Sequence, residues 1–392
     1  MQIFITGYGV ISSIGLNSVE NFQSLKEMKT GIDNTSDPIF GNYKVGRINY
    51  SNEELSSKFN LKTFGSRTAI LGMIAAKEAF EGHVLNSDIR TGLISGTSVG
   101  GMDLTEKVFA ELIENGVVSN AFNHHASGMS SLEIAKELGL ENTFINTIST
   151  ACSSAANAIM QGARLIQNNV LDRVIVGGTD SLTQFTFSGF RSLMIFDEEW
   201  CKPFDANRNG LNLGEGAGYI VLESEKSLEI SKKEPIAKLT GWNSSSDAYH
   251  QTASSPEGYG AVLSMEGALK MAKLAPNQID YINAHGTSTP NNDLSESVAF
   301  KKVFIDNVPV FSSTKSYTGH TLAASGGIEA VFAINSILNG VVYPNLNFTT
   351  EIIETKLTPQ LKFEEGHEIQ NVLSNSFGFG GNNSTIIISS LK

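Results

Sequence analysis

The fold is decided by a strand, a turn and a helix at residues 143–167, which read TFINTISTACSSAANAIMQGARLIQ. The apolar run that ends at Ile148 predicts a buried β-strand. The small residues after Cys152 predict a helix that other backbone or a substrate can approach closely. The cysteine between them therefore lies at a helix start, where unpaired amides and the positive end of the helix dipole meet.

Short apolar runs alternate with longer helical patterns along all 392 residues. This alternation predicts an α/β fold whose strands are buried on both faces. The predicted strands are Ile3–Thr6, Thr91–Ser95, Thr143–Ile148, Arg173–Val176, Tyr219–Glu223, Ile282–Ala284, Val308–Ser312 and Thr385–Ser389. The predicted helices are Thr68–Phe80, Leu132–Leu138, Ser153–Gln167, Ala261–Leu274 and Gly326–Leu338.

A second strand–turn–helix unit shares the pattern of the first. An apolar strand ends near residues 313–315, and Thr318–Gly319–His320 precedes another helix of small residues. Two such units suggest a duplicated architecture, with halves at residues 1–228 and 229–392 that meet in the polar stretch Glu225–Glu234. The residue identities alone leave a chance similarity of pattern as the alternative.

The composition limits the partners and the cellular location. The formal net charge of −12 argues against general nucleic-acid binding, because a phosphate backbone favours a basic surface. No apolar run approaches about 18 residues, so no membrane span is expected. The N-terminus lacks a signal peptide and reads as a strand that starts near Met1 and turns at Gly7. Two cysteines are typical of a reducing cytoplasm.

Cys152 is a candidate nucleophile. The field of the helix start favours thiolate over thiol and thereby lowers the pKa of a cysteine. A buried structural cysteine is the alternative for Cys152. It is the favoured interpretation for Cys201, which lies between Trp200 and Lys202 with no small-residue helix after it.

A second candidate segment is INAHGTSTP at residues 282–290. His285 ends a strand and suits the edge of a pocket, and Thr287 and Thr289 could hydrogen-bond an amide-bearing ligand arm. A satisfied core histidine beside a polar turn is the alternative. Asp293 and Glu296 begin the next helix, and we interpret them as capping and ion-pairing residues.

Two further segments complete the set of candidates. Lys315 and His320 flank a turn, where the lysine can keep the ring neutral by like-charge repulsion and Glu329 could pair with the lysine. A solvated lysine and an unrelated loop histidine are the alternative. The loop NSFGFGGNN at residues 375–383 could aim an amide into a site or act as a gate, or be a tight turn.

Taken in order, these segments resemble the elongating β-ketoacyl-acyl carrier protein synthases of the thiolase-like superfamily. The resemblance covers nearly the whole chain. It rests on TACSS at 150–154, FD at 204–205 with GEGAG at 214–218, SSDAYH at 245–250, HGTSTP at 285–290, Lys315 to His320, and NSFGFGG at 375–381. It implies a thiolase-like fold in which duplicated βαβαβαβ halves form five αβαβα layers.

The resemblance also implies the chemistry, a decarboxylative Claisen condensation of a malonyl-acyl carrier protein with an acyl chain. Cys152 would hold that chain as a thioester, and His285 and His320 would bind the malonyl carbonyl and stabilise the enolate. Lys315 would support the histidines, and Glu329 and Asp293 or Glu296 would order the surroundings. The amides of Cys152 and Phe379 would form an oxyanion hole, and Phe379 would also act as a gate. Thr287 and Thr289 would bind the phosphopantetheine arm, and the pocket would be lined by Val99, Phe190 and Phe377.

The chain departs from the family pattern at Asn209, Asn292 and Asn382 and in the short polar stretch Asn120–Ser131. That stretch contains His124–His125, which we interpret as loop or pocket wall because no third ligand stands at metal spacing. The family has a longer apolar loop there, which shapes the acyl pocket and the dimer interface. The departure leaves the chain length and the partner open.

The resemblance implies an acyl carrier protein as partner and no bound cofactor, since the carrier delivers the phosphopantetheine arm. It further implies a homodimer, or a heterodimer with a chain-length-factor-like homologue. Carrier proteins are acidic, as this chain is, so docking requires a local basic patch. The candidate patch is Lys58, Lys62 and Arg67.

Three other functions stay open at this point. The chain could be the catalytic ketosynthase subunit of a type II polyketide or polyene system. It could be a non-catalytic subunit that binds carrier protein, although the full set of candidate residues disfavours that. A biosynthetic thiolase would use a second cysteine, and the context of Cys201 does not match one.

Overall fold

The computed structural model describes residues 2–305 and 307–392, so Met1 and Asp306, which the two predicted halves include, lie outside the described residues. The strands are β1 (Ile3–Ser12), β2 (Ile32–Asp33), β3 (Val45–Gly46), β4 (Thr91–Gly96), β5 (Phe144–Ile148), β6 (Arg173–Asp180), β7 (Gly216–Ser224), β8 (Ala237–Ser246), β9 (Tyr281–Asn283), β10 (Val310–Ser312), β11 (Val341–Val342), β12 (Glu364–Glu365), β13 (Asn371–Gly378) and β14 (Asn382–Ser389).

The α-helices are α1 (Ser18–Lys26), α2 (Asn52–Lys58), α3 (Arg67–Ala79), α4 (Met102–Asn115), α5 (Ser127–Glu137), α6 (Ser154–Gln167), α7 (Gln184–Ser192), α8 (Glu225–Ser231), α9 (Tyr259–Ala272), α10 (Pro290–Phe304), α11 (Lys315–Thr318) and α12 (Ser325–Asn339). Short 3₁₀ turns are η1 (Asn120–His124), η2 (Pro276–Gln278), η3 (Leu322–Ala324) and η4 (Phe379–Gly381).

The large sheet consists of two halves with the same topology. Its described strands run in the order β10-β9-β13-β14-β8-β1-β7-β6-β4-β5. In the first half, β5, β4 and β6 are parallel and β7 and β1 pair antiparallel; β10, β9, β13, β14 and β8 repeat this pattern. Phe4 and Ile5 of β1 pair with Lys238 and Ala237 of β8 and thereby link the halves. The predicted duplication is confirmed.

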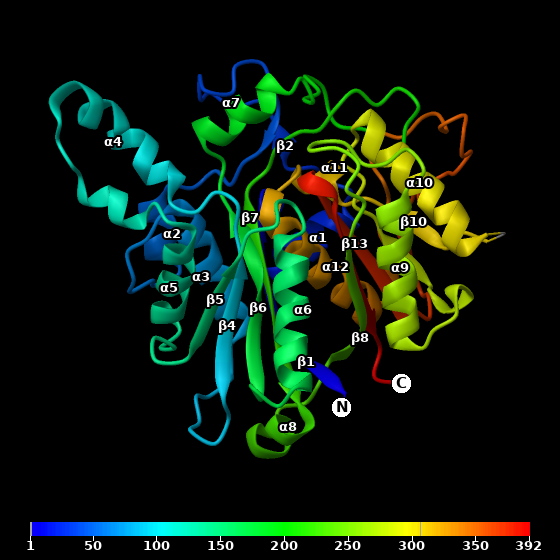
Figure 1. Ribbon diagram of the computed structural model, residues 1–392, viewed down its shortest axis with the longest axis horizontal. Coiled ribbons are helices and arrows are strands. Elements are labelled where there is room, and N and C mark those ends of the chain that lie inside the picture. Colours follow the sequence, from blue (N-terminus) through cyan, green and yellow to red (C-terminus); the bar gives the residue numbers. More distant parts are fainter. Residues whose placement is uncertain (1, 306) are drawn as a thin grey trace.

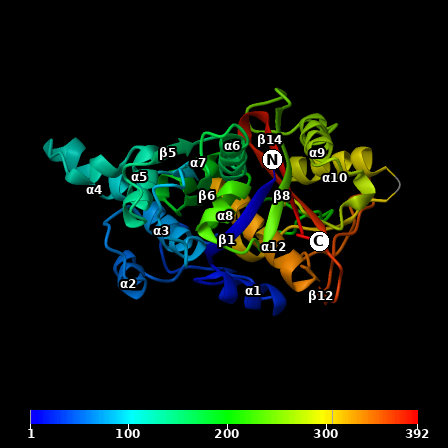
Figure 2. The same cartoon turned by 90° about the horizontal axis from the view of Figure 1, so that it is seen from below.

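The helices form three layers around the two half-sheets. Helices α3 and α5 cover the outer face of the first half, and α9 and α10 cover that of the second (Figure 1). Helices α6 and α12 lie between the two halves, as the view from below also shows (Figure 2). Separate apolar cores fill the central layer and the two outer interfaces. The five-layered αβαβα arrangement is therefore confirmed.

Every predicted strand and helix overlaps one that forms, with shifted ends. Among the strands of the large sheet, the prediction missed β8 and β13, whose sequences AKLTGWNSSS and NVLSNSFG interrupt the apolar pattern with serine and asparagine. Both strands pair along their length with β14, so long-range pairing forms them where local preference is weak.

The predicted turn at Gly7 is wrong, because β1 continues through it to Ser12. A Cβ atom at Gly7 would lie 2.1 Å from the carbonyl oxygen of Ala79 in α3. Glycine at this position therefore lets the helix pack directly on the strand and does not turn the chain.

Within the described residues, Leu322–Asn339 is long and apolar enough to cross a membrane by length and composition alone. This segment comprises η3 and α12, and 83% of it is buried inside the fold. A core helix of the central layer passes the same test, so the segment is weak evidence for a span.

Candidate active site

Cys152 lies in a tight turn between β5 and α6, the two elements that the opening stretch of sequence predicted. Ala151 has a positive φ of 52°, an unusual conformation for a residue with a side chain. Ser154 holds the turn, because its hydroxyl accepts a hydrogen bond from the amide of Thr150 at 2.8 Å and donates one to the carbonyl of Ala151 at 2.6 Å. The Cys152 side chain is consequently fixed at the start of α6.

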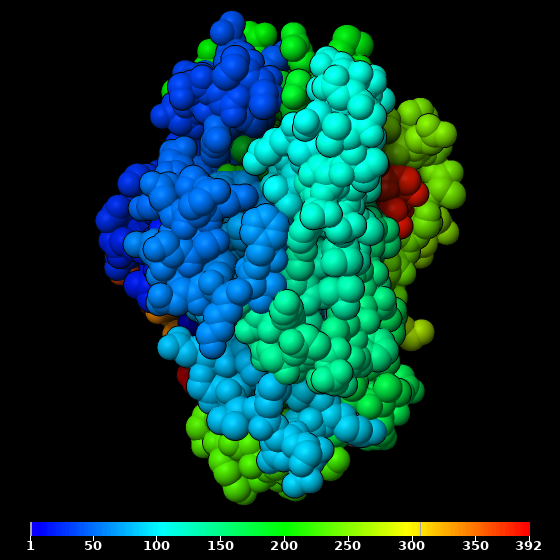
Figure 3. Space-filling model, turned by 90° about the vertical axis from the view of Figure 1, so that its left-hand side faces the viewer, coloured from blue at the N-terminus to red at the C-terminus, as the bar shows by residue number. Residues whose placement is uncertain are grey.

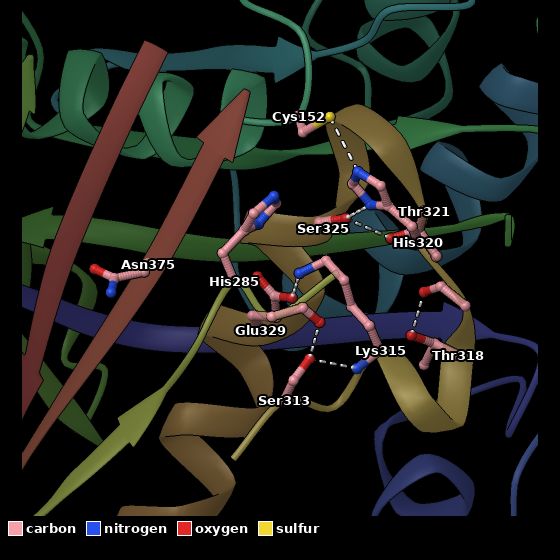
Figure 4. A network of polar contacts seen from close by, with 12 residues as sticks. Cys152, His285, Ser313, Lys315, Thr318, His320, Thr321, Ser325, Glu329 and Asn375 are labelled. Atoms are coloured by element: carbon pink, nitrogen blue, oxygen red, sulfur yellow. Dashed lines mark hydrogen bonds and ion pairs between the residues drawn. The ribbon is translucent and has the colours of Figure 1, made fainter. Parts of the chain in front are cut away.

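His320 lies beside the thiol of Cys152. Its Nε2 atom is 3.0 Å from the Sγ atom of Cys152, and its Nδ1 atom is 3.1 Å from the hydroxyl of Ser325 (Figure 4). The cysteine comes from the first half of the chain and the histidine from the second. The nucleophile and its partner therefore meet only when the two halves pack together.

The surroundings of Cys152 raise the pKa of its thiol to about 12, because the side chain is buried. Lys315 and the backbone amides of Cys152 and Phe379 oppose this rise, and Asp180 adds to it. The predicted lowering of the thiol pKa at the helix start is therefore wrong for this site. Burial penalises the thiolate more than the amides and the lysine stabilise it.

Both histidines of the site are neutral at physiological pH. Burial and then the charge of Lys315 lower the pKa of His320 and His285 well below 6.5. A neutral imidazole 3.0 Å from a protonated thiol can accept its proton. The pair is thus a thiol with an adjacent general base.

His285 follows β9 and faces His320. The two ring centroids are 5.5 Å apart, and the ring planes are nearly perpendicular at 85°. Glu296 holds the backbone of this turn by accepting hydrogen bonds from the amides of His285 at 2.9 Å and Gly286 at 2.8 Å. Burial raises the pKa of Glu296 to about 7.

The predicted capping and ion-pairing roles of Asp293 and Glu296 are wrong. Asp293 accepts hydrogen bonds from the amides of Phe204 at 2.7 Å and Ser288 at 3.1 Å, and Glu296 holds the turn at His285. Both carboxylates are fully buried. Both residues lie in the first half of α10. Backbone amides of the preceding loops donate hydrogen bonds to the two carboxylates, in place of the basic side chains that an ion pair would require.

Lys315 and Glu329 form a buried ion pair that joins α11 to α12 (Figure 4). The predicted pairing of these two residues is confirmed. Burial raises the pKa of Glu329 to about 7, and the lysine opposes the rise. Glu329 thus holds the ammonium of Lys315 near both histidines, where its charge adds to the larger effect of burial and lowers their pKa values.

Phe379 approaches the nucleophile from η4, directly after β13. Its backbone amide and that of Cys152 both lower the pKa of the thiol, against the larger effect of burial. A Cβ atom at the preceding Gly378 would lie 3.0 Å from the amide nitrogen of Cys152, so glycine lets this segment come close. The ring of Phe379 stacks on Phe190 of α7, with centroids 5.7 Å apart and planes 19° apart. The oxyanion hole from these two amides stays a prediction, and the close approach of Gly378 to Cys152 is consistent with it.

A cavity of about 280 Å³ leads to Cys152. Its walls include most of the predicted pocket and catalytic side chains, namely His285, Thr287, Thr289, His320, Phe190, Phe377 and Phe379. Val99 is absent from this lining and packs instead in a buried apolar cluster with Phe187 and Leu211. The prediction for Val99 is therefore wrong for this cavity, because the adjoining aromatic cluster covers its side chain.

Sequence reasoning missed three residues that support the site. Asp180 ends β6 and accepts hydrogen bonds from Thr97 and from the amides of Ser98, Val99 and Ala323. Asn375 donates to Glu296 at 3.0 Å, and Ser325 contacts His320. A polar residue that directly follows a buried apolar strand, as in VIVGGTD at 174–180, was the available signal for Asp180.

The predicted docking residues differ in their exposure. Lys58 and Lys62 are exposed on the surface. Arg67 makes a bidentate contact with the buried carboxylate of Glu215, at 2.7 and 2.6 Å. The prediction for Arg67 is therefore wrong, since an arginine held in this way tethers α3 and is not free to meet a partner.

His124 and His125 are each bound within the protein. Nδ1 of His124 contacts the carboxylate of Glu133, and Nδ1 of His125 lies 2.9 Å from the hydroxyl of Thr105. Over residues 2–305 and 307–392, no group of three or more His, Cys, Asp or Glu side chains is arranged to hold a metal ion. Both cysteines are free, and the buried Cys201 donates to the carbonyl of Lys315 at 3.7 Å.

Comparison with known proteins adds an independent result. The family model "Beta-ketoacyl synthase, N-terminal domain" matches residues 1–227, and "Beta-ketoacyl synthase, C-terminal domain" matches residues 236–349. The chain is 32% identical to 3-oxoacyl-[acyl-carrier-protein] synthase 2 of Staphylococcus aureus, over 99% of this chain and 98% of the relative. The corresponding protein of Synechocystis is 31% identical, over 98% of this chain and 97% of the relative.

Solved structures of ketosynthases resemble the whole chain. The ishigamide ketosynthase/chain length factor superimposes with a TM-score of 0.91 and 26% identity, over 100% of this chain and 99% of the other. The ketosynthase ApeO from Xenorhabdus doucetiae, in complex with its chain length factor ApeC, gives 0.85 and 29% identity, over 99% and 98%. A β-ketoacyl synthase from Burkholderia phymatum gives 0.88 and 26% identity, over 100% of both chains.

Proposed function

The chain belongs to the β-ketoacyl synthase family and is a condensing acyltransferase, and on this premise we propose that Cys152 is its nucleophile. The observation that carries the proposal is the approach of His320 Nε2 to within 3.0 Å of the thiol of Cys152. The reaction is the decarboxylative condensation of a malonyl-carrier thioester with an acyl chain bound to the cysteine.

In the first step, the acyl chain moves from a carrier thioester to Cys152. The Sγ–H proton passes to Nε2 of His320 as sulfur attacks the carbonyl carbon, and the two amides receive the developing oxyanion. Collapse of the adduct breaks the bond to the pantetheine sulfur, which leaves with the proton from Nε2. Because burial and Lys315 keep His320 neutral, the ring is ready to accept this proton.

In the second step, the malonyl group loses CO₂ and the electron pair of the broken C–C bond forms an enolate. Hydrogen bonds from His285 and His320 stabilise the enolate oxygen, while the charge of Lys315 supports both rings. The enolate carbon attacks the Cys152 thioester, and the cysteine leaves as a thiolate that regains a proton. The second step consumes one proton from solvent, since the malonyl carboxylate departs as neutral CO₂.

Mass spectrometry after incubation with an acyl-carrier thioester tests this proposal. We expect one acyl adduct, mapped to Cys152, that disappears when malonyl-carrier is added. The C152A variant should carry no adduct, and Cys201 in the same protein is an internal control because it is also a buried free thiol. An adduct elsewhere, or no adduct on the wild-type protein, would reject Cys152 as nucleophile and revive the non-catalytic subunit.

We propose that the cavity receives the phosphopantetheine arm of a carrier protein. Thr287 and Thr289 line the cavity, and their hydroxyls lie 2.9 Å apart, so they present donors and acceptors to the amides of such an arm. The double variant T287V/T289V should raise KM for carrier-bound substrate at least about fivefold, which corresponds to roughly 1 kcal/mol of lost hydrogen bonding. An unchanged KM would reject this assignment.

For carrier docking we retain Lys58 and Lys62, which are exposed. The K62E variant should slow acylation by carrier-bound substrate more than acylation by a small thioester, because only the carrier brings an acidic surface. The exposed Lys29 offers a matched control, K29E, that should leave both rates unchanged. Equal slowing of both substrates by K62E would refute the docking role.

We propose that the chain works as a dimer through the face formed by β5 and α4. β5 is the outermost strand of the first half, with one edge unpaired by any described strand. Apolar side chains are exposed beside it, including Phe109, Ile113 and Phe144. Figure 3 looks onto this face, where the cyan and green segments of α4, α5 and β5 run down the surface.

The partner in this dimer is either a second copy or a homologue. Neighbouring solved structures contain a ketosynthase with its chain length factor, which favours the second possibility and a polyketide or polyene pathway. Light scattering of the purified chain should give twice its 42.1 kDa if it pairs with itself. A monomer that forms a stable pair only with a cysteine-lacking homologue would identify the heterodimer.

We place the active protein in the cytoplasm, where both free cysteines stay reduced.

A further inference from the structure

The second ring nitrogen of His320 faces two hydroxyl groups. Nδ1 lies 3.1 Å from the Oγ atom of Ser325, which in turn lies 3.1 Å from the Oγ1 atom of Thr321 (Figure 4). Ser325 is the first residue of α12, and all three side chains are at least 98% buried. The contact is therefore shielded from bulk water.

The proposed reaction requires both neutral tautomers of this ring. In the first step Nε2 must present a lone pair to the Cys152 thiol, so the ring hydrogen is on Nδ1. In the second step Nε2 must donate a hydrogen bond to the enolate, so the hydrogen is on Nε2 and Nδ1 has the lone pair. The ring carries both hydrogens only briefly during a proton transfer, since burial and Lys315 lower the pKa of His320.

The partner of Nδ1 therefore has to accept a hydrogen bond in one step and donate one in the next. A carboxylate or a carbonyl can only accept, and a backbone amide can only donate. A hydroxyl does both by rotation about its C–O bond. The nearby charged groups are engaged elsewhere: Lys315 binds Glu329, and Asp180 binds the amides at Ser98, Val99 and Ala323.

We propose that Ser325 is a positioning residue that pairs with Nδ1 of His320 in both tautomers and thereby lets one histidine serve both half-reactions. In the first step its Oγ accepts from Nδ1–H and its own hydrogen points to Thr321. In the second step its hydrogen turns to Nδ1. Between the steps Nε2 first gains a proton from solvent that enters the cavity, and the Nδ1 proton then leaves along the hydroxyls of Ser325 and Thr321. After condensation Nε2 gives its proton to the Cys152 thiolate, and Nδ1 regains one along the same two hydroxyls.

This inference rests on the proposed function, and S325A tests it in two separate half-reactions. Acylation of Cys152 is followed by rapid quench and mass spectrometry, and CO₂ release is followed after malonyl-carrier is added to pre-acylated enzyme. We expect both rates to fall roughly tenfold, because the ring loses its buried partner in either tautomer. KM for the carrier should stay unchanged, since Ser325 does not line the cavity.

The matched control is S336A. Ser336 is also fully buried and lies on the same helix α12, but its hydroxyl donates to the carbonyl of Val341 and does not contact the site. S336A should cost similar thermal stability and leave both half-reactions unchanged. If S336A slows them as S325A does, the loss reflects general loosening and the inference is overturned.

A double-mutant cycle separates positioning of His320 from every other role of Ser325. H320A alone should slow both half-reactions, and S325A in the H320A background should change neither rate by more than about twofold. Additive losses, or a loss confined to one half-reaction, overturn the inference. If H320A itself slows neither step, the proposed role of His320 fails. If H320A slows both and S325A slows neither, the inference alone fails.

Discussion

At the scale of single residues, two opposing effects act on the thiol of Cys152. The side chain lies two residues before α6, where the helix dipole favours the thiolate by up to about 2 kcal/mol. Burial acts in the other direction and raises the thiol pKa from 9.0 to about 12, which corresponds to about 4 kcal/mol. The resting site therefore holds a thiol, and in the proposed reaction His320 removes its proton when a substrate arrives.

The reaction of Cys152 with iodoacetamide should reveal this high pKa. We expect slow alkylation at pH 8 and a rate that still rises with pH at pH 10, because the thiolate fraction keeps growing below a pKa of about 12. The measurement is peptide mass spectrometry across pH 7 to 10.5, with Cys201 as a second buried thiol in the same sample. A rate for Cys152 that levels off below pH 9 would contradict this assignment.

At the scale of secondary-structure elements, glycine residues in the strands let the two central helices approach the sheet. A Cβ atom at Gly178 of β6 would lie 2.8 Å from both Ala155 in α6 and the carbonyl oxygen of Ala323. A Cβ atom at Gly218 of β7 would lie 2.3 Å from the amide nitrogen of Ile328 in α12. These contacts set the distance between the helix that follows Cys152 and the helix that follows His320.

The G218A variant should therefore push α12 away from β7 and weaken both stability and catalysis. We expect a loss of about 2–3 kcal/mol in the free energy of unfolding and slower acylation of Cys152, because a well-packed interior resists added volume. Urea unfolding and adduct mass spectrometry measure the two effects.

The control for this substitution is G189A. A Cβ atom at Gly189, inside α7, meets no atom within 4 Å. Alanine should therefore stabilise that helix by roughly 0.5–1 kcal/mol. A G218A protein as stable as G189A would show that the close contact of β7 with α12 is not required.

At the scale of the whole molecule, the two halves share one active site. Cys152 and Phe190 come from the first half, and His285, His320 and Phe379 come from the second. A central core with side chains from both halves joins them. The division at residues 228 and 229 stays a prediction, and α8 occupies the predicted boundary. Each half alone would lack part of the chemistry.

A buried ionic network far from the cavity ties the strands of the first half together. Glu223 of β7 contacts Arg173 of β6 at 3.2 Å and accepts a hydrogen bond from Thr6 of β1 at 2.9 Å. His83 and Ser227 also contact this carboxylate. Hydrogen bonds and the arginine charge overcome the effect of burial and lower the pKa of Glu223 from 4.5 to about 2.

Glu223 should therefore contribute to stability at neutral pH and lose this contribution in acid. Its folded pKa lies below the unfolded value, so the contribution is complete above pH 4.5 and disappears as pH falls toward 2. The full shift corresponds to about 3 kcal/mol, of which about 2–3 kcal/mol is lost between pH 6 and pH 2.5. We expect the difference in unfolding free energy between wild type and E223Q to shrink by this amount from pH 6 to pH 2.5.

Urea denaturation at a series of pH values measures that difference. Glu296 gives a contrasting control, because burial raises its pKa to about 7 and its protonation stabilises the fold as pH falls. The difference between wild type and E296Q should therefore not shrink with acid in the same manner. A pH-independent difference for E223Q would contradict the role of Glu223.

The sequence by itself determined the αβ alternation, the duplicated plan and the main reactive side chains. Apolar runs and small-residue helices are local patterns, so they predicted β5, α6 and the position of Cys152 between them. The ordered motifs predicted that His285, Lys315, His320 and Phe379 belong to one site with Cys152. Strands β8 and β13 could not be predicted in this way, because polar residues interrupt them and pairing with β14 forms them.

Tertiary structure alone decided the protonation states and the supporting contacts. Burial sets the pKa of Cys152, and no local sequence encodes how deeply a turn is buried. Local sequence also does not show that Arg67 binds the distant Glu215 instead of facing solvent. Nor does it show that Val99 packs into a largely aromatic cluster. Ser325 reaches His320 only because α12 begins under that ring. These properties depend on residues far apart in the chain, and packing of the two halves brings them together.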